Sequence, residues 1–371
     1  GSSSPNVTAP TGSALLALGM SCFTMTLGVL SNLTALGILA RASTHFRRRS
    51  KAPFLLLTGA LLLTDLGGHL IPGALALHLH LSRGRGRSRP ARELCQLFGA
   101  CMVFFGLCPL LLGGAMAVER CLGITRPLFH SAAVTAAHAR LAVALLASLA
   151  LLLATLPLLA VGRYTPQFPG TWCFLPLHGP LSAADAGLAL AFSGLGLAAL
   201  ALSLFCNTLS GLALLRAHLA PWGSRSARSG AGRGCHPVRV RPSSSSSSAR
   251  SLDTEMMAQL AGITIVSCVC WTPFLFLVSV SVLQFYLGSG HGGLDRPYER
   301  QVLLSLRLAS WNQILDPWVY ILLRRAVLRR LFQLLQPGPM EELDRPPGGE
   351  RVGGEAVGVA PNSSAEMGGC E

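Results

Sequence analysis

The chain has 371 residues, of which 51% are hydrophobic and only 12% are charged, and its mean hydropathy is +0.50. This balance excludes an ordinary soluble domain and is typical of a bundle of membrane helices. The net charge of +14 could indicate nucleic-acid binding. However, the Lys and Arg residues gather between long apolar runs, as in cytoplasmic loops of membrane proteins, so we expect no nucleic-acid partner.

Seven apolar segments are long enough to cross a bilayer, which requires about 20 residues. They are 14–40, 53–81, 94–118, 139–161, 183–215, 256–287 and 301–323. The first is too long for the apolar core of a cleavable signal peptide. The sequence therefore predicts an all-α fold, a seven-transmembrane helix bundle over residues 14–323, preceded by a short N-terminal stretch, 1–13.

Three further segments have distinctive compositions. Residues 324–336 mix Arg with Leu and Phe, which favours a short amphipathic eighth helix on the membrane surface, although a frayed end of the last span fits the same pattern. The loop 218–252 is rich in Ser, Arg and Gly, and the tail 337–371 is rich in Gly and Glu. Neither can bury a core, so we expect both to be disordered.

The distribution of positive charge predicts the orientation. Most of the 30 Lys and Arg residues follow the first, third, fifth and seventh segments. The positive-inside rule then gives a multi-pass plasma-membrane protein with an extracellular N-terminus and a cytoplasmic C-terminus. One loop, 82–92, disagrees, because its five arginines would lie outside. Asn6, in an Asn-Val-Thr sequence, is a plausible glycosylation acceptor on the outer side.

Most of the 11 cysteines lie within apolar spans, where they serve as small buried hydrophobes. Cys95 and Cys173 instead belong to the outer, oxidising side, where a disulfide is permitted. Such a disulfide would tie an outer loop over the mouth of the bundle; two free thiols are the alternative. Cys268 and Cys270 lack further metal ligands, so we expect no structural metal there.

Asn32, Asp65 and Asp316 place polar groups inside three different spans. An intramembrane carboxylate is a functional hypothesis by default. Two acids and an amide could hold a sodium ion, centred on Asp65, with water. A purely structural polar network fits the same residues equally well. His69, deep in the second segment, is expected to be a packed polar residue.

Two features suggest moving parts. Glu119 and Arg120 close the third segment, where adjacent opposite charges are either a solvated helix end or a switch that releases Arg120 towards a cytoplasmic partner. Pro273 lies within the sixth segment and must kink its helix, because proline lacks a backbone donor and clashes with the preceding turn. Trp271 lies beside that kink.

Arg307 lies one to two turns inside the outer end of the seventh segment, where a charge is costly. The acidic residues in the outer half of the predicted bundle all lie at its outer edge: Glu93, Asp185, Asp295 and Glu299. An unpaired guanidinium beneath a tethered loop is therefore well placed to bind a ligand carboxylate through two hydrogen bonds. The alternative is an arginine that snorkels to the lipid headgroups. The predicted ligand has an acidic head and an apolar body.

Several motifs resemble those of rhodopsin-like G-protein-coupled receptors: E-R-C at 119–121, C-W-x-P at 270–273 and D-P-x-x-Y at 316–320. E-R-C in place of D-R-Y and D-P in place of N-P are typical of the prostanoid receptors. GTWCF (170–174), MVFFGLCPLLLG (102–113) and LASWNQILDPWVYILLR (308–324) are also similar to that family. By this resemblance, which covers about 20–335, the chain is identified as a member of the prostanoid receptor family.

The resemblance implies roles for single residues. Arg307 would bind the prostanoid carboxylate, Thr171 and Trp172 would cap the pocket, and Ser310 would contact the ligand. His80 occupies a position where the family commonly has tyrosine, and its imidazole can still donate a hydrogen bond to a carboxylate. The implied activation switch comprises Glu119, Arg120, Trp271, Pro273, Asp316 and Tyr320.

The resemblance also implies a ligand and partners. Residues 68–75 and 206–217 look most like members that bind prostaglandin E2, whereas 255–260 and 324–331 are similar to thromboxane A2 receptors and 46–57 to prostaglandin F receptors. We expect prostaglandin E2 as ligand, with thromboxane A2 or prostaglandin F2α as alternatives. The partners would be membrane lipid and a heterotrimeric G protein of the Gq type, which releases calcium. We expect neither a cofactor nor enzyme activity. A transporter of lipid anions is the alternative hypothesis, which is disfavoured because internal repeats are not apparent in the sequence.

Overall fold

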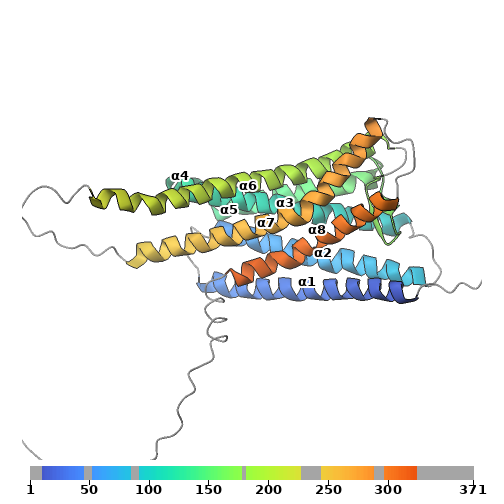
Figure 1. Ribbon diagram of the computed structural model, residues 1–371, viewed down its shortest axis with the longest axis horizontal. Helices are drawn as coiled ribbons and strands as arrows, with labels where there is room; N and C mark the ends of the chain where they lie inside the picture. The colour runs from blue at the N-terminus through green and yellow to red at the C-terminus, as the bar shows by residue number, and fades with distance from the viewer. Residues whose placement is uncertain are drawn as a thin grey trace, which may run out of the picture. The chain divides into compact units, whose positions relative to one another are not determined.

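The computed structural model describes residues 11–45, 52–84, 92–177, 181–226, 244–287 and 296–323. These residues form a helical bundle whose long helices run side by side (Figure 1). The long helices are α1 (Thr11–His45), α2 (Ala52–Gly84), α3 (Arg92–Thr125), α5 (Ala136–Thr155), α6 (Ala183–Ser226), α7 (Ser244–Tyr286) and α8 (Arg296–Leu322). The predicted all-α seven-helix bundle is confirmed. Asn6, the amphipathic segment 324–336 and the tail 337–371 lie outside the described residues.

Six of the described helices, α1, α2, α3, α5, α6 and α7, are long and apolar enough to cross a membrane. The seventh, α8, is less apolar because it carries Arg307, Asn312 and Asp316. Its 27 residues nevertheless extend about 40 Å, more than the roughly 30 Å of a bilayer core. Polar groups in a span face the bundle interior or a cavity, which agrees with the burial of Asn312 and Asp316.

Several helix ends differ from the predicted spans. α6 continues to Ser226 and α7 begins at Ser244, so both helices extend into the segment 218–252 where disorder was expected. α5 ends at Thr155, before the predicted end of its span, and a 3₁₀ turn, η2 (Leu156–Leu159), follows it. Pro157 in this turn has no backbone N–H to continue an α-helix.

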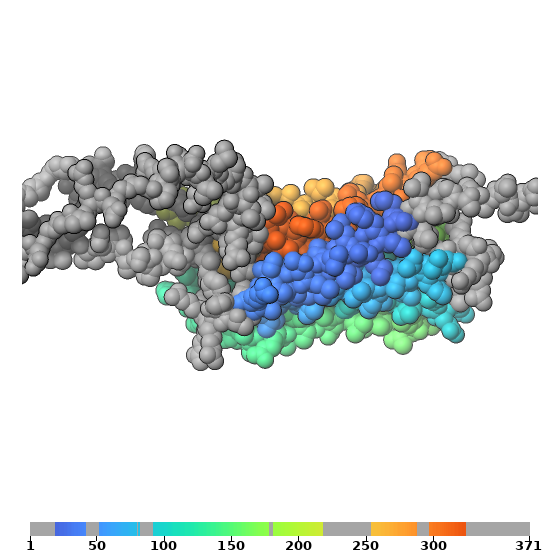
Figure 2. All heavy atoms as spheres, turned by 90° about the horizontal axis from the view of Figure 1, so that it is seen from below, coloured from blue at the N-terminus to red at the C-terminus, as the bar shows by residue number. Residues whose placement is uncertain are grey.

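α3 is the central helix: α2, α5 and α6 all pack against it. Its buried face includes Leu107, Leu112 and Met116, each with no exposed surface. α1 packs against α2 and α8, as Figure 2 shows on one face of the bundle. Because lipid tails are as apolar as leucine, close packing rather than exclusion of water holds such helices together.

A short hairpin covers one end of the bundle. β1 (Thr165–Gln167) pairs antiparallel with β2 (Trp172–Phe174), with Pro166 opposite Cys173. Gly170 completes the turn with φ of 89°, a conformation that glycine adopts without steric cost. A disulfide joins Cys173 to Cys95 on α3. Strands of three residues carry too little periodicity to be recognised in the sequence.

Candidate functional site

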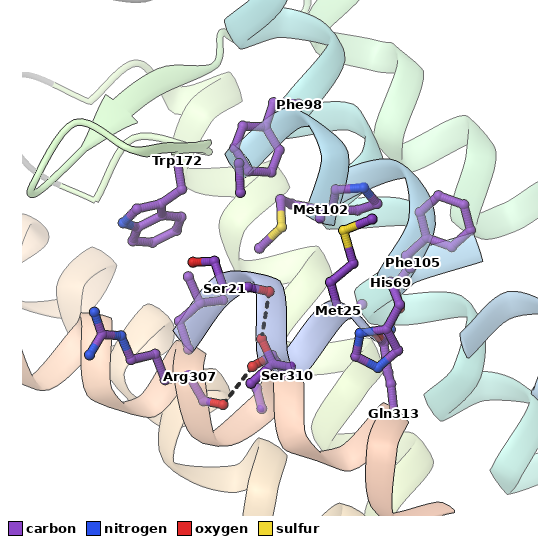
Figure 3. Close-up of a pocket in the computed structure, with 18 of the residues that line it drawn as sticks. Ser21, Met25, His69, Phe98, Met102, Phe105, Trp172, Arg307, Ser310 and Gln313 are labelled. Atoms are coloured by element: carbon purple, nitrogen blue, oxygen red, sulfur yellow. Dashed lines mark hydrogen bonds between the residues drawn. The ribbon is translucent and has the colours of Figure 1, made fainter. Parts of the chain in front are cut away.

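A cavity of about 220 Å³ lies at the hairpin end of the bundle, between α1, α2, α3, α7 and α8 (Figure 3). Much of its wall is apolar, with Met25, Phe98 and Met102 among the lining side chains. Thr171 and Trp172 of the hairpin also line it. The disulfide to α3 holds the hairpin in this position, and within the hairpin the Trp172 Nε1 donates to the Phe168 carbonyl at 2.8 Å.

Four of the predicted ligand residues, Arg307, Thr171, Trp172 and Ser310, line this one cavity. The Arg307 side chain is exposed, and within the described residues its guanidinium has no hydrogen bond or ion pair. The Ser310 hydroxyl donates to the Arg307 carbonyl at 2.7 Å. The cavity therefore presents a cation whose hydrogen-bonding groups are available to an anion. The side chain of His80 lies outside the described part of the chain.

His69 and Gln313 form the end of the cavity away from Trp172 (Figure 3). His69 is packed, as expected, with only 6% of its surface exposed, but its Nε2 atom has no hydrogen-bond partner within the described residues. Gln313 donates from Nε2 to the Phe105 carbonyl at 3.0 Å. Gly28 leaves room for the imidazole, since a Cβ there would lie 2.3 Å from the ring. From the sequence alone, His69 could be recognised only as a polar residue in an apolar span.

The polar residues of the spans lie beneath the cavity and are fully or almost fully buried. Asn32 donates from Nδ2 to the carbonyls of Gly28 and Gln313, both at 3.0 Å. Asp316 accepts from Asn312 Nδ2 at 2.8 Å, whereas neither carboxylate oxygen of Asp65 has a partner within the described residues. Asp65 and Asp316 lie close enough to interact electrostatically. Buried carboxylates in this arrangement require a proton, a cation or water.

A second charged cluster lies at the other end of α3. Arg120 donates from Nε and an Nη atom to the two carboxylate oxygens of Glu119. His130, on the short helix α4 (Pro127–Ala133), bonds Glu119 Oε1 through Nε2 at 2.8 Å. Arg120 also lies over the Phe54 ring, 5.0 Å from its centroid, and 3.7 Å from the sulfur of Met256 on α7. Glu119, Arg120 and His130 are each at most 6% exposed, so this pair is not a solvated helix end.

Aromatic rings connect the hairpin to α7. Phe174 of β2 packs edge-on against Phe192 and Phe274, with centroids 5.2 and 5.4 Å apart. Phe274 in turn contacts Trp271, which lines the cavity. In the sequence, Pro273 lies between these two residues, in the helix α7, which bends along its length in Figure 1. Further along α8, the Tyr320 carbonyl accepts a hydrogen bond from Gln259 of α7 at 3.3 Å.

Comparison with known proteins identifies the family. Residues 32–320 match the family described as "7 transmembrane receptor (rhodopsin family)". The chain is 52% identical over 360 residues to "Prostaglandin E2 receptor EP1 subtype" of Canis lupus familiaris, covering 90% of this chain and 86% of that protein. The chain belongs to the prostanoid receptors of the rhodopsin family. It is therefore a multi-pass plasma-membrane receptor and not an enzyme.

Other relatives agree with this assignment, and a solved structure supports the fold. The receptor is 48% identical over 340 residues to the Homo sapiens "Prostaglandin E2 receptor EP1 subtype", covering 85% of this chain and 82% of that one. It is 41% identical over 320 residues to the Homo sapiens "Prostaglandin F2-alpha receptor", covering 86% and 81%. The crystal structure of squid rhodopsin superposes with a TM-score of 0.67 at 14% identity and covers 86% of both chains, which supports the fold.

Proposed function

We propose that the receptor binds prostaglandin E2 in the hairpin-end cavity and signals through a heterotrimeric G protein of the Gq type, with release of calcium. One observation carries the proposal: Arg307 lines the cavity with Thr171 and Trp172, and within the described residues no acid pairs with it. Relatives with about half of their residues identical are named as prostaglandin E2 receptors. In this proposal the hairpin end is extracellular, Asn6 is glycosylated, and the opposite end faces the cytoplasm.

The role of Arg307 as the anchor follows from the chemistry of the proposed ligand, a fatty-acid derivative with a carboxylate. Its carboxylate would accept two parallel hydrogen bonds from Arg307, with the Thr171 hydroxyl and the Ser310 side chain nearby. Trp172 would cap the site, and His80 would provide a further donor. The apolar body would lie against the methionine and phenylalanine side chains of the wall. His69 and Gln313 offer polar atoms to the oxygen substituents of the ligand.

The signal would travel through α7, because this helix contacts both ends of the bundle. Trp271 lines the cavity, and Met256 on the same helix contacts Arg120. A ligand that favours a different position of Trp271 moves α7, loosens the contact with Met256 and frees Arg120 from Glu119 for the G protein. A sodium ion at Asp65, between Asn32 and Asp316, would favour the resting arrangement. Binding shifts the equilibrium only if the ligand has unequal affinity for the two states.

Prostaglandin F2α is the second candidate ligand, because a receptor named for it is 41% identical to this chain. A carboxylate anchor does not distinguish the two ligands, since both are acids. The distinction would come from the polar end of the cavity, where His69 and Gln313 lie. Thromboxane A2 is the third candidate.

Binding of tritiated prostaglandin E2 to membranes that contain the receptor tests the proposal. Arg307→Ala should weaken binding at least tenfold, because a hydrogen bond between charged groups contributes about 1.5–3 kcal/mol. Arg300→Ala removes the same charge from the same helix outside the cavity lining and should bind normally. Stronger competition by prostaglandin F2α or by a thromboxane mimic would contradict the choice of ligand. Unchanged binding by a folded Arg307→Ala receptor would contradict the anchor.

A further inference from the structure

A second cavity lies between α3, α5 and α6, in the half of the bundle that carries Glu119. α5 and α6 each pack against α3, but along their described residues they hardly contact each other. The resulting space, which we call the α3/α5/α6 cleft, has a volume of about 470 Å³, compared with about 220 Å³ for the hairpin-end cavity. An empty space of this size would forfeit many van der Waals contacts, so it requires an occupant.

Small side chains create the cleft. Ala115 on α3, Ala142 on α5 and Ala198 on α6 all line it. Alanine and glycine normally let membrane helices approach closely. Here the helices do not close the gap, so the small residues leave an open, almost wholly apolar cleft.

The cleft opens onto the membrane-facing surface. Ala198 and Leu202 line its α6 side and are exposed, and Leu145 and Leu149 of α5 are also exposed. Because these side chains belong to the surface that faces hydrocarbon, the opening is continuous with the bilayer. The occupant therefore enters from the lipid, and the apolar walls fit a hydrocarbon chain.

The polar end of the cleft fits a phosphate. His138, which lines the cleft, lies in the first turn of α5, and its Nδ1 bonds the Thr135 hydroxyl at 2.9 Å. Its Nε2 has no partner within the described residues. Thr135 is the N-cap of α5 and its hydroxyl accepts the His138 N–H; the remaining N–H groups of this turn and the dipole of the helix N-terminus favour an anion. The exposed Arg140, also in the first two turns, adds positive charge.

We infer that the α3/α5/α6 cleft binds an acyl chain of a phospholipid whose phosphate lies beside His138 at the N-terminus of α5. In the orientation proposed above, this lipid belongs to the inner leaflet. Val118, Glu119 and Leu122 form part of the cleft wall, so the chain contacts the helix turn that carries the Glu119–Arg120 pair. The site is separate from the ligand cavity, and its occupancy does not depend on which prostanoid the receptor binds.

Photolabelling tests this inference on the full-length receptor in phosphatidylcholine nanodiscs that contain a small fraction of phosphatidylserine with a diazirine in one acyl chain. After irradiation, mass spectrometry should locate the label in 111–122 and 195–202. Ala142→Phe, which fills the cleft, should lower this labelling roughly tenfold, the effect of losing one well-packed chain. Ala144→Phe is the matched control, because Ala144 is exposed on the same helix and does not line the cleft.

Further variants and lipid probes distinguish the classes of lipid and show whether a loss of labelling is caused by misfolding. Ala198→Phe fills the cleft from α6 and should repeat the result of Ala142→Phe. His138→Gln should lower labelling several-fold for the phospholipid but not for a diacylglycerol with the same diazirine chain. Labelling that neither filling variant reduces would show lipid bound only to the general surface and would overturn the inference. Stronger labelling of the cleft by a sterol diazirine than by the phospholipid would also overturn it.

Discussion

Arg307 and Arg120 lie near opposite ends of the bundle and have opposite surroundings. Arg120 is 5% exposed, is bonded twice to Glu119 and lies against the Phe54 ring. Arg307 is exposed in a cavity and has no acidic partner within the described residues. The same residue type therefore serves two purposes: a paired arginine holds a conformation, whereas an unpaired one is available to a ligand. Substitutions at the two positions should accordingly have different effects on stability and binding.

The largest expected difference is in thermal stability. Arg120→Ala leaves the Glu119 carboxylate buried without its main partner, which typically costs about 3–5 kcal/mol. The Tm of the purified receptor should fall by several degrees. Arg307→Ala leaves no partner uncompensated and should leave Tm within about one degree of the wild-type value. Equal losses of Tm in the two variants would show that Arg307 has a structural partner.

His130 is the second partner of Glu119, and its substitution tests the end of the bundle where Arg120 is paired. His130→Ala removes one hydrogen bond to the buried Glu119 carboxylate, at an expected cost of about 1–3 kcal/mol, less than the loss of Arg120. We expect a smaller fall in Tm and higher signalling without ligand, measured as calcium release. His78→Ala, at an exposed histidine of α2 that lines neither cavity, is the control for histidine loss. Basal signalling unchanged from wild type would mean that His130 does not help to hold Glu119.

Arg307→Lys should produce the smallest effect, and it acts on the unpaired end. Lysine keeps the charge but cannot form two parallel hydrogen bonds with a carboxylate. Prostaglandin E2 binding should weaken by about tenfold, less than in Arg307→Ala, with Tm unchanged. Binding equal to that of the wild type would indicate that only the charge matters.

Much of this architecture could be predicted from the sequence, because membrane spans are long apolar runs and Cys95, Cys173 and Arg307 interrupt the pattern at recognisable places. Arg307 could be recognised as a ligand anchor because it lies within an apolar span with no acid at its depth, whereas Thr171 and Trp172 came from the family motifs. The contact between His130 and Glu119 could not be predicted, because it depends on where α4 packs. The α3/α5/α6 cleft was also missed, since it results from a gap between helices rather than from any local pattern.

The most direct test compares prostaglandin E2 with its methyl ester on wild-type and Arg307→Ala receptors. If Arg307 binds the carboxylate, esterification should weaken binding to the wild type at least tenfold, in line with about 1.4 kcal/mol or more for a charge-assisted pair. The same esterification should have little effect on Arg307→Ala, because the charged partner is already absent. An equal loss of affinity in both receptors would contradict the account, since the carboxylate would then bind elsewhere.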